Sequence, residues 1–437
     1  ACCKAFNGDF DGDEMNVHVP QSLEAQAELK YLSSVRNSFI NSQNSKLNIV
    51  MVQDGVLGSY LMTKKNSRKL TRNQFFNATM RLSFTTQDVL IRMNRIQLTI
   101  DENPTSATTL LSGRGLVSLI LPSNFDYFSP IGKDQDEKNV IIKDGVLLFG
   151  CLSKSAIGSA HRCIPHMLYN EYGPDIALSF LDNLQFLANE FLLITSFTIG
   201  FKDCLKSSSA NTVGDTVKKC YMEAEGVLDT TSNKDIQESR INAALGKAKD
   251  IGMKIAKNSL ASDNNFISTV VGGSKGDFFN IAQITGLLGQ QNLSGKRVPF
   301  FMNNNTRTIP HYPLNLENFT VEQKFESRGF IKSSFISGLN PREFFFHACS
   351  GREGMSDTAV GTAVSGYISR RIVKLQEDMK VCYDGTVRDE TNRIFSLQYG
   401  DHGYDPTSTI QSDKGDQVFV DIGRLASLLN KEHEKKR

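Results

Sequence analysis

The feature that most constrains this fold is a helical pattern that follows Pro341 and runs to about Met379. Its apolar residues recur every four positions, which predicts an α-helix rather than a strand. They form two rows: Met355, Ala359, Ala363 and Tyr367, and Val360, Val364, Ile368 and Ile372. At 1.5 Å per residue the helix would be about 55 Å long, far above the average in globular proteins. Taken alone, such rows are more typical of core packing than of contact with nucleic acid.

The composition is that of a multidomain globular protein. With 437 residues, 40% of them hydrophobic and 22% charged, the chain is long enough for two to four domains and too apolar for a disordered tail. No apolar run of about 18 residues could cross a bilayer. A formal net charge of +2 argues against a protein that coats nucleic acid with its whole surface, but it leaves room for a local charged site.

The cysteines and the first residues add two expectations. The eight cysteines include no C-x-x-C pair, so we expect scattered thiols in a reducing compartment and no zinc site. The chain opens with Ala1-Cys2-Cys3-Lys4, without an initiator Met or a signal-peptide pattern. We therefore expect a processed chain or a piece of a longer one.

Local patterns in the first half predict a mixture of helices and strands. Residues 1–20 fit a strand, an acidic loop and a second strand, and residues 21–35 fit a helix. Residues 55–150 mix short helices and strands with turns such as Asp144-Gly145, and residues 157–199 are helical in pattern. These patterns favour an α+β fold.

The second half begins with a change of composition. Residues 205–260 are rich in Lys, Glu, Asp, Ser and Ala, and predict two polar helices that form a solvated hairpin rather than a core. The turn is expected near residues 230–233, with Ser232 or Asn233 capping the second helix. A further helix is expected from Asn280 to Gln291.

Three aspartates near the start carry the clearest chemical signal. Asp9, Asp11 and Asp13 alternate along the chain, so in extended backbone their carboxylates share one face. Converging carboxylates repel one another unless a cation neutralises them, and oxygen ligands favour Mg²⁺ or Ca²⁺. An EF-hand loop would need Gly and Glu where Glu14 and Pro20 stand. The remaining alternatives are a solvated acidic turn and a Mg²⁺ site suited to phosphoryl or nucleotidyl transfer.

Residues 7–13 resemble the N-A-D-F-D-G-D signature of the largest subunit of multisubunit DNA-directed RNA polymerases. Residues 14–22 continue it in the eukaryotic, archaeal and large-DNA-virus style, and Gly8 replaces the usual Ala. Further motifs of the family follow in the right order, so the resemblance covers residues 5–405. They are Phe197–Gly200, Gly273–Gly276, Asn280–Gln283, Gly289–Gln291, Gly295–Arg297, Arg307–His311, Gly338–Ala348, Gly351–Gly354, Asp357–Val360 and Gly366–Arg371.

The resemblance implies a set of site residues. Asp9, Asp11 and Asp13 would hold the catalytic Mg²⁺, and a second Mg²⁺ would arrive with the NTP. Asn7 matches the residue that contacts the ribose of the incoming nucleotide. Lys275 matches a lysine near the triphosphate, and an ammonium group is a good point charge for phosphate.

The long helix matches the bridge helix, which crosses the cleft behind the active site in the family. Thr362 and Ala363 match positions that pack against the nascent template base pair. Tyr367, Arg370 and Arg371 match positions near the template. Gly361 stands where the family usually has Lys, and Val364 where it usually has Glu. Because Gly weakens a helix by about 1 kcal/mol relative to Ala, we expect this helix to bend more easily.

The resemblance also implies a domain plan for a multidomain α+β chain. The expected parts are the C-terminal part of the catalytic double-psi β-barrel with the metal loop (1–20), a pore-region α/β segment (21–150), a funnel with a helical hairpin (151–270), an active-site-proximal segment (271–340), the bridge helix (341–380), and the start of a following domain with a frayed end (381–437). The upstream half of the barrel and the trigger loop of the family are missing from these residues, so the isolated chain is expected to lack polymerase activity.

The implied function is Mg²⁺-dependent transfer of nucleotides from NTPs to the RNA 3′ end on a DNA template. The implied partners are the second-largest and smaller polymerase subunits, the DNA template, the RNA transcript, NTPs and elongation factors that enter the funnel, with no membrane. The location would be nuclear, or cytoplasmic if the protein is viral. Two alternatives remain: a non-catalytic paralogue or scaffold that retains the fold, and a stand-alone Mg²⁺-dependent phosphohydrolase.

Overall fold

The structure is a computed structural model of the chain. It describes residues 1–41, 44–104, 106, 108–130, 139–205, 210–230, 233–260, 264–314 and 318–398, and beyond these 409–411, 417–419, 423, 426, 427, 429, 430 and 433. It divides into two compact units, which we describe separately. Unit 1 contains Ala1–Ser196, Val271–Ser274 and Arg371–Arg437, and unit 2 contains Phe197–Val270 and Lys275–Arg370. The predicted mixed α+β character is confirmed.

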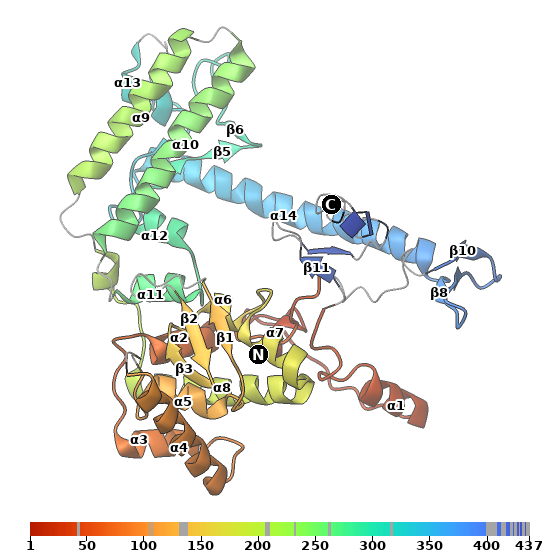
Figure 1. Ribbon diagram of the computed structural model, residues 1–437. Helices are drawn as coiled ribbons and strands as arrows, with labels where there is room; N and C mark the ends of the chain where they lie inside the picture. Colours follow the sequence, from red (N-terminus) through yellow and green to blue (C-terminus); the bar gives the residue numbers. More distant parts are fainter. Residues whose placement is uncertain are drawn as a thin grey trace. The chain divides into compact units, whose positions relative to one another are not determined.

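Unit 1 is built from helices packed around a small antiparallel sheet (Figure 1). The helices α2, α5, α7 and α8 contact one another or the sheet, and their apolar faces form one continuous core. The helices are α2 (Gln53–Thr63), α3 (Arg72–Thr79), α4 (Thr86–Glu102), α5 (Gly113–Ile120), α6 (Lys154–Ile157), α7 (Ile164–Tyr172) and α8 (Pro174–Thr195). The strands, in the order β1-β2-β3, are β1 (Tyr127–Ser129), β2 (Val140–Lys143) and β3 (Val146–Phe149).

The predicted Asp144-Gly145 turn joins β2 to β3. Both residues have positive φ, 50° and 70°, as a type I′ hairpin turn requires. A Cβ on Gly145 would lie 2.0 Å from the carbonyl oxygen of Pro122. The turn therefore demands glycine for its conformation and for its close approach to the neighbouring loop.

The strands expected within residues 1–20 are not formed, and this prediction is wrong. A 3₁₀ helix, η1 (Cys2–Lys4), opens the chain, and residues 5–22 contain no helix or strand before α1 (Leu23–Tyr31). An extended segment becomes a strand when its backbone groups pair with a neighbour. No described segment of this chain pairs with residues 14–20, so the alternation there has no ladder to join. The double-psi barrel stays a prediction.

Unit 2 contains the predicted polar hairpin, α9 (Ala210–Thr230) and α10 (Lys234–Ser259), which lie side by side in Figure 1. The Asn233 side chain accepts from the backbone N–H groups of Asp235 and Ile236 and caps α10, as predicted; Ser232 lies outside the described residues. The expectation of a hairpin without a core is wrong. Its facing residues are buried with residues that follow α12: Val217, Cys220, Tyr221, Ala224, Ile241, Ala244, Leu245, Ala248, Leu287, Phe325 and Phe330.

The helix expected from Asn280 to Gln291 is shorter than predicted. It is α12 (Phe278–Thr285), preceded by α11 (Asn265–Gly272). Gly286 follows it, and Gly289 has a φ of +79°, which a helix cannot continue through. Beyond it stand short elements: β4 (Gly289–Gln290) paired with β7 (Phe330–Ile331), β5 (Asn292–Leu293) paired with β6 (Lys296–Arg297), and α13 (Val321–Glu326). η2 (Phe201–Cys204) precedes the helical hairpin.

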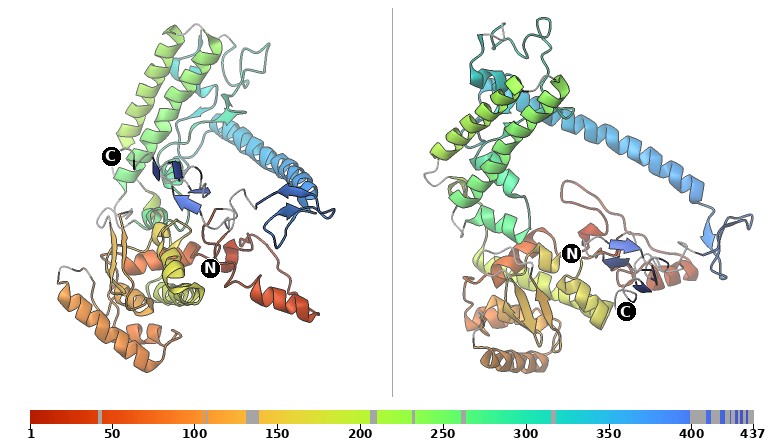
Figure 2. Two further views of the ribbon diagram at one scale, coloured as in Figure 1. Left: turned by 45° about the vertical axis from the view of Figure 1, so that its right-hand side comes forward. Right: turned by 45° about the horizontal axis from the view of Figure 1, so that its top comes forward.

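The predicted long helix is confirmed as α14 (Pro341–Gln376), three residues shorter than expected. Figure 2 shows it as a single rod in both views. Its start is fixed by a reciprocal cap: the Glu343 N–H donates to Asn340 Oδ1 at 2.9 Å, and the Asn340 N–H donates to Glu343 Oε2 at 3.1 Å. After it come β8 (Lys380–Val381), β9 (Val387–Arg388), β10 (Ile394–Ser396), β11 (Thr409–Gln411) and β12 (Gln417–Phe419).

Among the described residues, no helix combines the length and the apolar character needed to cross a membrane.

Candidate metal loop and nucleic-acid interface

The three predicted aspartates converge. Asp9, Asp11 and Asp13 are exposed, and one carboxylate oxygen from each lies within 4.8 Å of the others. The loop is closed by the Asp9 N–H, which donates to Asp13 Oδ2 at 3.0 Å. Gly12 has a φ of +121°, a region that favours glycine. The described part of the chain holds no second cluster of three or more His, Cys, Asp or Glu side chains with this geometry.

The loop is anchored by the 3₁₀ turn before it. The Gly8 N–H donates to the carbonyl oxygen of Cys3 at 3.1 Å, and the Asn7 N–H to that of Lys4 at 3.2 Å. The Lys4 ammonium group donates to the Leu47 carbonyl oxygen at 3.1 Å. These bonds tie the entry of the loop to unit 1, while its acidic tip stays open to solvent.

The negative charges of the aspartates in the loop repel one another. A side-chain hydrogen bond with Asp11 raises the pKa of Asp9 above its usual value, and slight desolvation by the neighbouring atoms and the negative charge of Asp11 add to this rise. A carboxylate whose pKa is raised by its neighbours gains most from a bound cation. Three exposed carboxylates are also the hard oxygen ligands that Mg²⁺ prefers. The residues present therefore fit a divalent cation.

The two predicted nucleotide-binding residues lie in different units. Asn7 belongs to unit 1 and has a φ of 50° at the entrance of the acidic loop. Lys275 belongs to unit 2 and is exposed between Gly273 and Gly276, which have φ of 77° and 73°. Asp277 follows it and caps α12 by accepting from the Asn280 N–H at 3.0 Å. Lys275 thus sits on a tight turn that presents its side chain to solvent.

The predicted bridge-helix residues lie on the exposed part of α14. Thr362, Ala363, Tyr367, Arg370 and Arg371 are all exposed. The Thr362 hydroxyl donates to the Thr358 carbonyl oxygen one turn earlier, at 2.8 Å. Apolar side chains on this stretch are exposed as well: Val360, Val364, Tyr367, Ile368 and Ile372. Among the residues that the structure describes, these rows therefore do not make the core packing that they usually signal.

The sequence analysis missed a cluster of polar contacts in unit 2. Glu353 of α14 accepts from Ser294, and Glu238 of α10 pairs with Arg297 and Arg328. The partners lie 59 and 90 positions apart, so no periodicity connects them. These contacts can be recognised only in the folded chain, where charged side chains that are distant in the sequence lie partly buried beside one another.

Comparison with known proteins identifies the family. Models of four consecutive domains of RNA polymerase Rpb1 match in order: domain 2 on residues 1–35, domain 3 on 38–204, domain 4 on 226–331 and domain 5 on 338–427. The chain belongs to the Rpb1 family of RNA polymerase largest subunits.

Two curated Rpb1 relatives align with nearly the whole chain. The chain is 44% identical over 452 residues to a probable DNA-directed RNA polymerase II subunit RPB1 homolog of Invertebrate iridescent virus 6, covering 98% of the chain and 43% of that protein. It is 34% identical over 420 residues to the DNA-directed RNA polymerase II subunit RPB1-B of Trypanosoma brucei brucei, covering 93% of the chain and 23% of that protein. The chain thus spans less than half the length of these Rpb1 relatives.

Proposed function

We propose that residues 7–13 form the catalytic metal loop of a DNA-dependent RNA polymerase. In the assembled enzyme the loop supports transfer of nucleotides from NTPs to the RNA 3′ end on a DNA template. The observation that carries this proposal is the convergence of Asp9, Asp11 and Asp13 within 4.8 Å in a chain of the Rpb1 family.

Each residue has a separate task in this proposal. Asp9, Asp11 and Asp13 hold Mg²⁺, which when bound lowers the pKa of an attacking hydroxyl, while a second ion accompanies the NTP. Asn7 contacts the ribose, and Lys275 contributes a point charge to the triphosphate.

The exposed half of α14 supplies the bridge helix in the same proposal. Thr362 and Ala363 present small side chains to the template base pair, and Tyr367, Arg370 and Arg371 approach the template strand. From Gly361 to Lys374 the helix carries three cations and no acid, which suits contact with phosphates. The domain plan given above, including the partial barrel, the pore and the funnel, belongs to this proposal.

The proposal includes partners and a location. The chain works with the second-largest and smaller polymerase subunits, and elongation factors enter through its funnel. It works in the nucleus, or in the cytoplasm if the protein is viral. Purified alone, it is expected to incorporate no nucleotides, and template-dependent incorporation by the isolated chain would contradict this.

Substitution of the central aspartate tests the metal loop. We expect Asp11→Asn to weaken binding of Mn²⁺, used as a paramagnetic probe for Mg²⁺, by about tenfold or more. The reason is that it removes one of three charges that the cation neutralises. In the assembled polymerase the same change is expected to lower nucleotide addition by about a hundredfold or more. Electron paramagnetic resonance and single-nucleotide addition measure the two effects.

The matched control is Asp101→Asn, which removes a carboxylate from the exposed end of α4 in the same unit. It is expected to leave Mn²⁺ binding and activity unchanged. A non-catalytic scaffold predicts that Asp11→Asn has no effect on a polymerase that remains active. A stand-alone phosphohydrolase predicts phosphate release by the isolated chain that Asp11→Asn abolishes.

A further inference from the structure

A small hairpin in unit 2 is held at its tip by the long helix. Strands β5 and β6 are joined by Ser294 and Gly295, whose φ of 50° and 75° define a tight two-residue turn. The Ser294 N–H donates to Glu353 Oε1 and Oε2 at 2.8 and 2.9 Å, and the Ser294 hydroxyl donates to Oε1 at 2.7 Å. Glu353 thus holds the turn through three charge-assisted hydrogen bonds, which are stronger than neutral ones.

Two further residues on the same side of α14 contact the chain just before the turn. The Ser350 hydroxyl donates to the Asn292 carbonyl oxygen at 3.2 Å, and His347 Nδ1 lies 3.3 Å from Gln291 Oε1. His347, Ser350 and Glu353 are three residues apart, and residues at this spacing are neighbours on a helix surface. The helix therefore contacts β5 and the turn along a continuous line.

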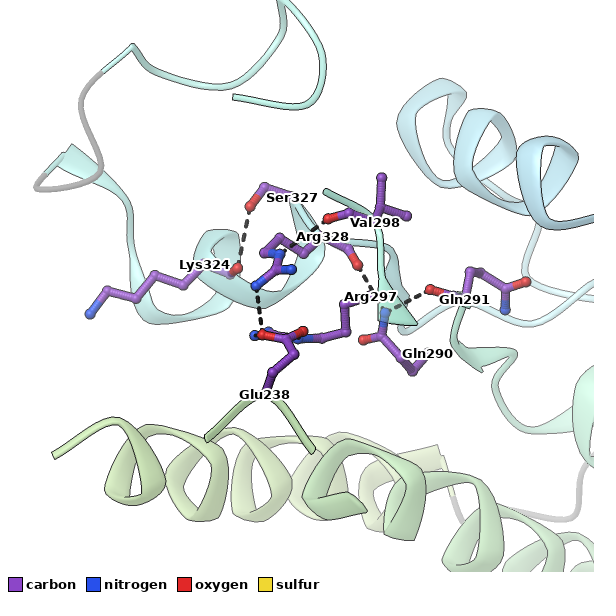
Figure 3. A network of polar contacts seen from close by, with 8 residues as sticks. All are labelled: Glu238, Gln290, Gln291, Arg297, Val298, Lys324, Ser327 and Arg328. Atoms are coloured by element: carbon purple, nitrogen blue, oxygen red, sulfur yellow. Dashed lines mark hydrogen bonds and ion pairs between the residues drawn. The ribbon is translucent and has the colours of Figure 1, made fainter. Parts of the chain in front are cut away.

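The returning strand is held from the opposite direction by α10. Arg297 of β6 donates from Nε to Glu238 Oε1 at 2.6 Å and from a terminal nitrogen to Oε2 at 2.7 Å. Arg328 adds a third bond to the same carboxylate at 2.9 Å and donates to the Val298 carbonyl oxygen at 3.1 Å (Figure 3). Only 5% of the Arg297 side chain is exposed, so water solvates its charge poorly. The Glu238 carboxylate neutralises that charge instead.

The contact at Glu353 marks a boundary along α14. Glu343 and Phe346 are buried, and Glu353 is half-buried. From Gly354 to Arg370 every residue is exposed. Glu353 is thus the last residue of α14 that other residues of unit 2 partly cover. The exposed stretch that contains Thr362 and Ala363 starts after it.

We propose that Glu353 is a positioning residue for the exposed half of α14, and that the β5–β6 hairpin is a clip that links α10 to this helix. The clip is short, its two-residue turn is held by the Glu353 carboxylate, and its strand β6 is held by the Glu238 carboxylate. A displacement of α10 is therefore transmitted to the point from which the exposed helix extends. The catalytic part of this inference rests on the proposed function, because it assigns the exposed half to the template.

The first test measures local stability in the chain itself. Glu353→Gln keeps the shape of the side chain but removes its charge. We expect amide hydrogen exchange in residues 292–297 and 350–358 to become about five- to tenfold faster. The matched control is Glu322→Gln, because Glu322 forms a surface ion pair with Lys332 in which both side chains are about half exposed. Equal exchange rates in Glu353→Gln and the wild type would overturn the positioning role.

The second test asks whether the hairpin connects the two helices. Glu238→Leu combined with Arg297→Leu removes the nearly buried Arg297 charge together with its partner, so that this guanidinium is not left unpaired. Arg328, whose side chain is 20% exposed, loses its carboxylate partner but keeps its bond to the Val298 carbonyl oxygen. We expect faster exchange in residues 350–358, although neither residue belongs to α14. Adding Glu353→Gln is expected to give less than the product of the separate effects, since all three act through one hairpin. Unchanged exchange in α14 of the paired variant would show that the clip does not reach α10.

The third test separates positioning from simple loss of structure. In the assembled polymerase, Glu353→Gln is expected to lower the single-turnover rate of each active complex, with the KM for NTP changed by less than about twofold. A merely structural role would reduce the number of active complexes and leave the rate of each one unchanged. Full activity of Asp11→Asn would refute the proposed function, whereas the exchange results decide the clip independently.

Discussion

At the scale of single residues, Tyr221 stands out because its ring is well packed and its hydroxyl is not satisfied. The residue is 3% exposed and stacks on Phe325 at 5.3 Å between ring centroids, with Phe330 edge-on at 5.1 Å. Its hydroxyl is buried and has no hydrogen-bond partner among the described residues. Burial, with nearby carboxylates such as Glu326, raises the pKa of this phenol far above its usual value.

We expect Tyr221→Phe to raise the free energy of unfolding of unit 2 by about 1 kcal/mol, because it removes a buried polar group without a partner and keeps the ring contacts. Urea unfolding and amide exchange in α9 measure this. Tyr221→Leu, which removes the aromatic contacts, is expected to destabilise the unit. A Phe variant no more stable than the wild type would contradict the prediction.

At the scale of elements, α14 combines great length with glycines in its exposed half. A Cβ added at Gly361 would have no atom within 4 Å, so alanine fits there without a clash. We expect Gly361→Ala to stabilise the helical state by up to about 1 kcal/mol and to slow amide hydrogen exchange around residue 361. In an assembled polymerase we expect an altered elongation or pausing rate, because the helix bends less easily.

The control for this prediction is Gly354→Ala in the same helix. A Cβ at Gly354 is also free of contacts, but this position lies next to the clip rather than in the middle of the exposed stretch. The Gly354→Ala variant is expected to gain about as much helix stability as Gly361→Ala, but to change the elongation rate less. Unchanged rates for Gly361→Ala would remove the idea that this glycine tunes bending.

How much of each element the sequence predicts depends on whether its partner is local. The start of α14 follows from Asn340, whose reciprocal cap with Glu343 is a local signal. The α9–α10 core was also within reach, since Val217, Cys220, Tyr221 and Ala224 recur at helical spacing; the surrounding polar residues masked it. Residues 14–20 alternate as a strand does, but a strand depends on its neighbour. The convergence of the three aspartates was predicted from their alternation along the chain. The contact between Glu353 and Ser294 could not be predicted, because these residues lie 59 positions apart.

At the scale of the whole molecule, the two units are expected to respond differently to acid. In unit 1 the rings of His161 and His166 lie 5.0 Å apart, and the Arg162 N–H donates to His166 Nδ1 at 3.2 Å. Burial lowers the pKa of both, and nearby charges add to this: Arg162 and Lys46 for His161, and His161 itself for His166. In unit 2, burial opposes ionisation of Glu238, but Arg297 and Arg328 outweigh it and lower its pKa.

The sign of each effect follows from these directions. A histidine with a lowered folded pKa binds fewer protons folded than unfolded, so its stabilising effect is full above its ordinary pKa of 6.5 and is lost as the pH falls below it. For Glu238 the loss starts only below 4.5. We therefore expect unit 1 to weaken as the pH falls from about 6.5 towards 4.5, before Glu238 contributes in unit 2.

Calorimetry and amide exchange at several pH values measure this difference. His161→Gln is expected to flatten the response of unit 1, and the exposed His18→Gln is expected to leave it unchanged. A parallel loss of stability in both units over this range would contradict the prediction.

The exposed apolar rows of α14 have a consequence for how such a chain is made in a cell. A newly synthesised copy displays Val360, Val364, Tyr367 and Ile368 to water, and chaperones bind exposed apolar side chains of this kind. We therefore expect an unassembled copy to be retained by chaperones or degraded. The helix that we propose for the assembled polymerase would then also report whether assembly has taken place.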